Sequence, residues 1–128
     1  MLSVLRPYRR WTGVAASKLD LMIVREVAKL AEFQSQKMGK TTVVAGESLF
    51  VGLNSFEPGQ EHSAHSHAGQ DKLYVILEGT AEVRIGEEEA VLTVGDAAFA
   101  PSGVVHAIRN PGPERMVVMA VLAPPPKK

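Results

Sequence analysis

The sequence predicts an all-β domain built as a sandwich or barrel, and three observations predict it. From Thr41 onward, short apolar runs of strand length follow one another, separated by turns rich in glycine and proline. The segment Ala81 to Ile85 alternates apolar and charged residues, turns at Gly86-Glu87 and returns through residues 90–94, which is the pattern of a β-hairpin. The run 116–122 is apolar without alternation, as expected of a strand buried on both faces.

The expected strands can be placed in chain order. Residues 43–45 and 49–56 form the first runs, separated by Gly46, and Pro58-Gly59 closes the second run as a type II turn. The further expected strands are residues 72–77, 81–85, 90–94, 97–100, 104–109 and 115–122. For the last of these, one face is expected in the core and the other under a neighbouring part of the sheet or a partner subunit.

The two ends of the chain differ from the domain expected at residues 22–123. Residues 1–21 carry four basic side chains and one acidic one, and we expect a weakly ordered basic leader there. Ser17 and Asp20 resemble a capping box before a helical apolar stripe, whereas Met22–Arg25 also suits a short strand. We expect a strand at 22–25, then a short helix or loop to Met38. Residues 124–128 are expected to form a solvated, polyproline-like tail.

Composition excludes several function classes. Lysine plus arginine equals aspartate plus glutamate at 14 each, so net charge gives no reason to expect a nucleic acid or an acidic membrane as partner. Cysteine is absent, so a metal site would need histidine, carboxylate or amide ligands. No apolar run approaches the roughly 18–20 residues that span a bilayer. We therefore expect a soluble, cytoplasmic protein.

Two segments carry histidines in a pattern that suits a metal. In an extended strand, side chains two residues apart share a face, so His65 and His67 can direct both imidazoles at one point. In the second segment, a tight turn at residues 101–103 leads into a strand that carries His106. Such hairpins can close a site between facing sheets, and borderline metals favour neutral imidazole. The alternative is a histidine-rich surface loop. We expect His62 to be exposed or to support the site without ligating.

The glycine, proline and histidine spacing of these two segments resembles the paired motifs of the cupin superfamily. The first motif comprises Gly59, His65, His67 and Gly79, and the second Gly95, Pro101, Gly103, His106 and Asn110. The resemblance covers about residues 22 to 123. It implies a double-stranded β-helix, or jelly roll, with one metal ion inside the barrel, and often a homodimer.

One position departs from the resemblance. Members with this spacing usually have a glutamate ligand where this chain has Lys72, and an ammonium group cannot ligate a divalent metal without losing its proton. The fourth ligand could then be Gln70, or less favourably Asp71, which needs a bulge to turn inward; otherwise water or substrate fills the position. We expect Lys72 at the barrel mouth, paired with Asp71 or a substrate carboxylate. Tyr74 shares its face and is a candidate pocket residue.

The resemblance favours a small metalloenzyme that holds one divalent transition metal, iron, manganese, nickel, zinc or copper, and acts on a small polar organic molecule. Dioxygenase, isomerase and decarboxylase chemistry all fit such a site. The alternative is a cupin without catalytic activity that binds a small ligand as a sensor or storage module. We expect a small molecule and a second copy of the chain as partners, with no nucleic acid and no membrane.

Overall fold

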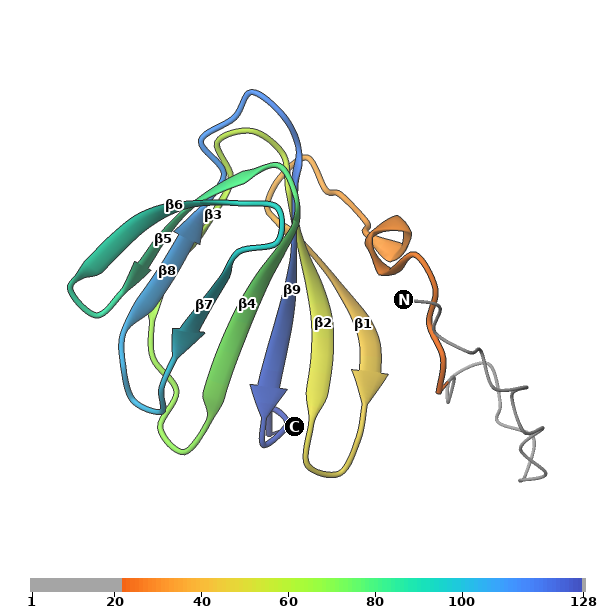
Figure 1. The fold of residues 1–128 in the computed structure, drawn as a ribbon, viewed down its shortest axis with the longest axis vertical. Coiled ribbons are helices and arrows are strands. Elements are labelled where there is room, and N and C mark those ends of the chain that lie inside the picture. The colour runs from red at the N-terminus through yellow and green to blue at the C-terminus, as the bar shows by residue number, and fades with distance from the viewer. Residues whose placement is uncertain (1–21, 128) are drawn as a thin grey trace, which may run out of the picture.

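The computed structural model describes residues 22–127, so the predicted basic leader, the capping box at Ser17 and Asp20, and Lys128 lie outside the described residues. Within the described part, the strands form two antiparallel sheets that face each other (Figure 1). One sheet has five strands in the order β1-β2-β9-β4-β7, and the other has four in the order β3-β8-β5-β6. This is the jelly-roll arrangement, and it confirms the predicted all-β fold.

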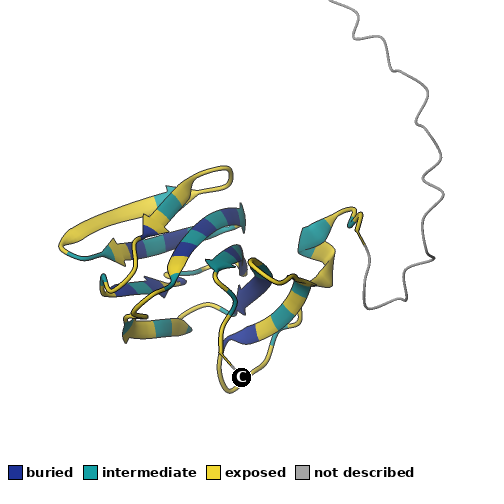
Figure 2. Cartoon of the chain, turned by 90° about the horizontal axis from the view of Figure 1, so that it is seen from below, coloured by how far each residue is buried: buried dark blue, intermediate teal, exposed yellow. Residues whose placement is uncertain are grey.

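The strand bounds overlap the predicted runs at every described strand except β3, which no predicted run covers and which ends before His67. They are β1 (Gly39–Ala45), β2 (Phe50–Phe56), β3 (Glu61–His65), β4 (Asp71–Glu78), β5 (Thr80–Ile85), β6 (Glu88–Thr93), β7 (Ala97–Ala100), β8 (His106–Arg109) and β9 (Met116–Ala123). The predicted hairpin is β5 with β6, in which Ile85 pairs with Glu88 across the expected turn. Its outer strand β6 is almost wholly exposed, whereas buried residues gather on strands of both facing sheets (Figure 2).

The core lies between the sheets, on the inward faces of β2, β4, β5, β8 and β9. Its largest fully buried side chains include Tyr74, Phe56, Ile76, Ile108 and Met116. The buried run in β9 follows from its place at the centre of the five-stranded sheet, between β2 and β4. Val118 packs in the core, and its neighbour Val117 on the opposite face is also 0% exposed. Both faces of this part of β9 are therefore buried, as the missing alternation predicts.

Two motif glycines are required by the backbone. Gly59 has φ 86°, and the N–H of Gln60 donates to the carbonyl of Glu57 at 3.1 Å, which is the predicted type II turn. Gly79 has φ 79°, and a Cβ at this position would overlap the carbonyl oxygen of Arg115. A side chain at position 79 would therefore collide with the chain that enters β9.

The segment before β1 differs from its prediction. No strand forms at residues 22–25; Met22 is 83% exposed and Ile23 is 61% exposed. A single 3-10 turn spans Val27–Leu30, in agreement with the expected short helix. Met38 joins the core at the end of this segment. The expected strand is absent because no strand of the described chain pairs with residues 22–25, and a strand needs such a partner to satisfy its backbone.

Asn110 joins three parts of the chain at the end of β8. Its side chain is 1% exposed. Its Nδ2 donates to the carbonyls of Phe56 at 3.0 Å and Glu114 at 2.9 Å, while its Oδ1 accepts from the N–H of Gly112 at 2.8 Å. Both polar atoms of the side chain are thus engaged with backbone groups. Asn110 is a structural clamp that ties the second motif to the end of β2.

We expect Asn110→Ala to lower the free energy of unfolding by about 2–3 kcal/mol, because three backbone groups lose their partner, one of them in a buried hydrogen bond and two in partly buried ones. Urea denaturation followed by circular dichroism measures the change. The exposed substitution Glu88→Ala in β6 serves as a control and should stay within about 0.5 kcal/mol of the wild type. Equal stability of the two variants would show that Asn110 is not a clamp.

Candidate metal centre

A β-bulge in β3 determines which histidines face the barrel interior. β3 pairs with β8 through His62 opposite Ile108, but the next pair is His65 opposite His106. One extra residue therefore lies on the β3 side between these pairs. Strict alternation would place positions 62 and 65 on opposite faces, whereas the bulge turns both toward the interior, where Ile108 and His106 are buried. The imidazole rings of His62 and His65 lie 4.1 Å apart, centre to centre. His62 is thus half-buried against the site, rather than exposed.

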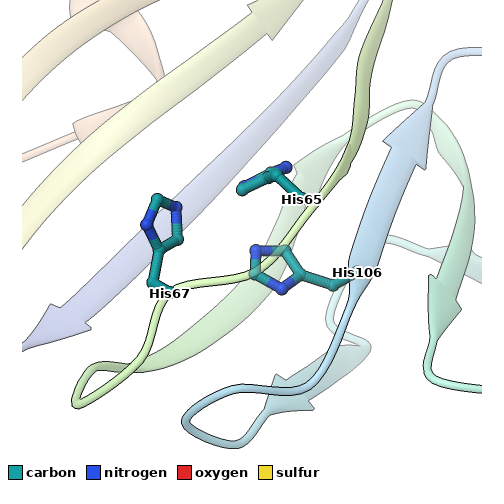
Figure 3. A group of neighbouring side chains, drawn as sticks. All are labelled: His65, His67 and His106. Atoms are coloured by element: carbon teal, nitrogen blue, oxygen red, sulfur yellow. The ribbon is translucent and has the colours of Figure 1, made fainter.

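Three histidines converge inside the barrel mouth. His65 ends β3, His67 follows in the loop, and His106 opens β8, and their side chains point toward a common space (Figure 3). One nitrogen from each of the three lies within 4.8 Å of the others. The ring centres of His65 and His106 are 4.2 Å apart, and those of His65 and His67 are 5.0 Å apart. The two predicted segments therefore meet at one point that three nitrogens can share.

Backbone hydrogen bonds fix which nitrogen of each buried ring faces this point. The Nδ1 of His65 donates to the carbonyl of Ser63 at 2.7 Å, and the Nδ1 of His106 donates to the carbonyl of Val104 at 3.0 Å. Because a carbonyl only accepts, the proton of each ring is on Nδ1 and Nε2 carries a free lone pair. Both Nε2 atoms are buried without a hydrogen-bond partner in the described part of the chain. A buried lone pair without a partner is costly, and a metal ion would satisfy both.

The surroundings keep these imidazoles neutral. Burial lowers the pKa of His65 and of His106, although the hydrogen bonds to Ser63 and Val104 oppose this effect in part. Burial, aided by the charges of His65, Lys72 and Lys40, lowers the pKa of His62 to about 3. Neutral imidazole is the form that ligates a metal, so the site is ready for a metal at neutral pH.

The two candidates for a fourth ligand lie differently. Gln70 immediately precedes β4 and lines the same cavity as His65 and His67, and its Nε2 donates to the carbonyl of Pro124 at 2.9 Å. Its amide oxygen is not used in that bond. Asp71 is exposed, and its Oδ1 accepts from the N–H of Ser102 at 2.9 Å. Asp71 is therefore held by the neighbouring loop, and its carboxylate is not part of the histidine group.

That neighbouring loop also holds His67 in place. The carbonyl of His67 accepts from the N–H of Gly103 at 3.0 Å, and the hydroxyl of Ser102 accepts from the N–H of Gly69 at 2.6 Å. The loop of the first motif is thus bound to the turn of the second. The sequence indicates only a turn at residues 101–103, because hydrogen bonds between distant loops leave no local pattern in it.

Lys72 lies on the inward face of β4, where it lines the cavity of the histidines, and the predicted pairing with Asp71 is wrong. Its pairing with a substrate carboxylate stays a prediction. Alternation along β4 turns Lys72, Tyr74 and Ile76 inward, and Lys72 is only 5% exposed. Its Nζ lies 4.8 Å from the centre of the Tyr74 ring. Burial, together with the charge of Lys40, lowers the pKa of Lys72 to about 8. Because Asp71 points outward on the opposite face of the strand, it cannot reach this amine.

Tyr74 is more deeply buried than a pocket residue would be. Its side chain is 0% exposed, and its hydroxyl has no hydrogen-bond partner among the described residues. Burial raises the pKa of its phenol. The ring centres of Tyr74 and His106 are 6.0 Å apart. Tyr74 therefore packs in the core beside His106 and Lys72, and it is not among the residues that line the cavity.

The histidines open into a cavity of about 740 Å³. Its wall includes His65 and His67, Gln70, Lys72, Lys40 and residues 124–127 of the tail. The tail was expected to be solvated, and Pro124, Pro126 and Lys127 are exposed, whereas Pro125 is half-buried. The bond from Gln70 to Pro124 holds the tail along the cavity. Residues 124–127 are thus part of the site.

Comparison with known proteins places this geometry in a family. A sequence model described as "Cupin domain" matches residues 52–122, which include all three converging histidines. The chain belongs to the cupin family. The crystal structure of TT1209 from Thermus thermophilus shares 41% identity and a TM-score of 0.77, over 80% of this chain and 98% of that one. A Klebsiella pneumoniae protein with a double-stranded β-helix domain shares 27% identity and a TM-score of 0.73, over 79% and 89% of the two chains.

The curated relatives differ in length from this cupin. Mannose-1-phosphate guanylyltransferase RfbM of Salmonella typhimurium is 31% identical over 58% of this chain, which spans only 16% of RfbM. Tetracenomycin polyketide synthase protein TcmJ of Streptomyces glaucescens is 36% identical over 66% of this chain, which spans 58% of TcmJ. The match to RfbM thus concerns a small part of that protein. Among residues 22–127 of this cupin, no helix has the length and apolar character to cross a membrane.

Acid should destabilise the metal-free protein through its buried histidines. The pKa of His62 falls from 6.5 in the unfolded chain to about 3 in the fold. Between these values the unfolded state binds the proton and the native state does not, so stability is full above about pH 6.5 and falls as pH falls. Melting temperature measured from pH 8 to pH 5 in the presence of a chelator should decline below about pH 6.5. His62→Gln should flatten that decline, and parallel curves for the two proteins would refute this account of His62.

Proposed function

We propose that this cupin binds one divalent transition metal through His65, His67 and His106 and acts as a mononuclear metalloenzyme on a small polar organic molecule. The observation that carries this proposal is the pair of buried Nε2 atoms, on His65 and His106, that have no partner among residues 22–127 and lie beside His67. An all-imidazole set favours iron, manganese, nickel, zinc or copper over magnesium and calcium. Structural zinc sites usually close all four positions, whereas three protein ligands leave one open.

The open position is where a substrate would meet the metal. A bound ion would supply Lewis acidity and, in the case of iron, the ability to activate dioxygen. The protein contributes orientation: the backbone bonds at Ser63 and Val104 hold two rings, and the Ser102 turn holds the loop of His67. In our proposal the amide oxygen of Gln70 is the candidate protein ligand for the fourth position, and water or substrate is the alternative fourth ligand.

The reaction is proposed only as a class: dioxygenase, isomerase or decarboxylase. The relatives bear the names of a guanylyltransferase and of a polyketide synthase protein, and one fold hosts many reactions. A second candidate is a cupin that binds its ligand without changing it. The half-enclosed cavity lined by the tail favours both equally, since a sensor also needs a pocket of this size. A homodimer and a cytoplasmic location stay predictions.

Metal analysis of protein purified without an affinity tag should give about one transition metal per chain. Alanine at His65, His67 or His106 should remove it, because two imidazoles alone hold a divalent ion much more weakly. The fourth histidine of the chain provides the matched control: His62→Gln should retain the metal. Full metal content in all three alanine variants would refute the ligand assignment.

Gln70 and Lys72 should differ in their effect on the metal. Gln70→Ala should lower affinity modestly if the amide ligates, whereas Lys72→Met should leave metal content intact because a protonated amine is no ligand. Competition with a chromogenic chelator measures both affinities. Loss of metal in Lys72→Met, together with unchanged metal affinity in Gln70→Ala, would contradict our assignment of Gln70 and Lys72.

Enzyme and binder are separated by the fate of a ligand. A compound that raises the melting temperature of the metal-loaded protein should be consumed on incubation, with oxygen uptake if iron is bound, and should survive incubation with His106→Ala. Mass spectrometry of the recovered compound decides the question. Quantitative recovery of the unchanged compound, in air and with each of the five metals, would assign the protein to the binders.

A further inference from the structure

The cavity beside the histidines contains a buried cation that the metal site does not use. Lys72 is 5% exposed and lines the cavity wall next to His62 and His65. Among residues 22–127, no carboxylate forms an ion pair with its amine. Buried lysines are rare unless they are paired, because removal of the charge from water is costly.

A second lysine faces the same space. Lys40 pairs with Asn54 in the register of β1 and β2, and Asn54 in turn pairs with Val118 of the core, so Lys40 lies on the inward face of its sheet. Both Lys40 and Lys72 line the cavity of about 740 Å³ and a smaller one of about 270 Å³ next to it. The proximity is unfavourable, since the charge of Lys40 is one cause of the lowered pKa of Lys72.

The lining of both cavities offers no compensating negative charge. No aspartate or glutamate is among the described residues that line either cavity, and Lys127 of the tail adds a third amine to the larger one. The family position that would usually carry an acidic side chain is Lys72 itself. The smaller cavity continues the larger one along apolar surface from Phe50, Ala120 and Leu122. The combined space therefore has a cationic centre and an apolar end.

We infer that the ligand of this cavity is a small organic acid, whose carboxylate pairs with Lys72 and Lys40 while its carbon skeleton extends along Phe50 and Leu122. An anion would give both amines the partner that the described residues do not supply, and charge-assisted hydrogen bonds of this kind are the strong ones. An inorganic oxyanion would leave the apolar end empty. This inference rests on the proposed function only in that the metal would be a second contact for the acid. The contacts with the two lysines do not depend on the metal.

The test compares carboxylates with uncharged molecules of the same shape. Acetate, succinate and benzoate, together with acetamide, succinamide and benzamide, are titrated calorimetrically at pH 7 and low salt into wild-type protein, both zinc-loaded and chelator-treated. At least one carboxylate should bind, and more tightly than its amide. Lys72→Met and Lys40→Met should each weaken that binding by about tenfold or more, the size expected for loss of a hydrogen bond between charged groups.

Lys29→Met is the matched control, because Lys29 is exposed and pairs with Glu26 far from the cavity, and it should bind the carboxylate like the wild type. Lys40 is exposed, so its variant should fold even if Lys72→Met does not. Melting temperature and zinc content are measured for each variant. Lysine-dependent binding by a protein that takes up no zinc during loading would support the organic acid and refute the metal proposal. Equal binding of acids and amides, unchanged binding in Lys40→Met, no binding of any acid, or tighter binding of inorganic phosphate would overturn the inference.

Discussion

The pairing of β3 with β8 is the constraint on which the candidate site depends. It brings His65 opposite His106, two residues far apart in sequence, and antiparallel partners lie close enough for their side chains to touch. The bulge in β3 is essential to this register. Without the extra residue, Ala64 would face His106 and His65 would turn to the outer face. One inserted residue thus decides whether the barrel holds a metal-binding group or an apolar wall.

The interior of this barrel contains several polar side chains. Around the apolar core of Phe56, Ile76 and Ile108 lie His106, Lys72 and Tyr74, each at most 5% exposed. The Nε2 of His106 and the hydroxyl of Tyr74 are buried without a partner in the described chain, and each such group lowers the stability of the fold. Violations of this kind concentrate at functional sites, where ligand binding supplies the missing partner. The metal and the organic acid that we propose would satisfy different members of this group.

The sequence predicted the strands well because they follow from local patterns, whereas the meeting of the two histidine segments was implied by the resemblance of their spacing to the cupin motifs. Apolar runs, turns rich in glycine and proline, and the clean alternation at residues 81–85 each specify their own element. The prediction of a strand at residues 22–25 was wrong because a strand needs a neighbouring strand to pair with, and no local pattern shows whether one is present. For His62 the sequence left two alternatives, exposure or support of the site, and the structure agrees with the second. The sequence could not decide between them because the bulge that turns His62 inward has no glycine to mark it.

The surroundings of Lys72, Asp71 and Gln70 also could not be predicted from local sequence patterns. Alternation along β4 already placed positions 72 and 74 on one face, and Lys72 was expected at the mouth because an ammonium group cannot ligate a divalent metal. The pairing of Asp71 with the Ser102 backbone, and of Gln70 with Pro124, joins segments that are distant in sequence. The cavity wall formed by the tail is likewise a tertiary feature. The candidate histidine ligands could therefore be predicted from the sequence, whereas the hydrogen bonds and the tail that surround them could not.

A crystal structure of the zinc-loaded protein with anomalous data tests the central claim most directly. Our account predicts one strong anomalous peak inside the barrel, at about 2.0–2.1 Å from the Nε2 atoms of His65 and His106 and from a nitrogen of His67. A peak bound through Nδ1 of His65 or His106, a peak centred on His62, or no peak in the barrel at full zinc loading would contradict it.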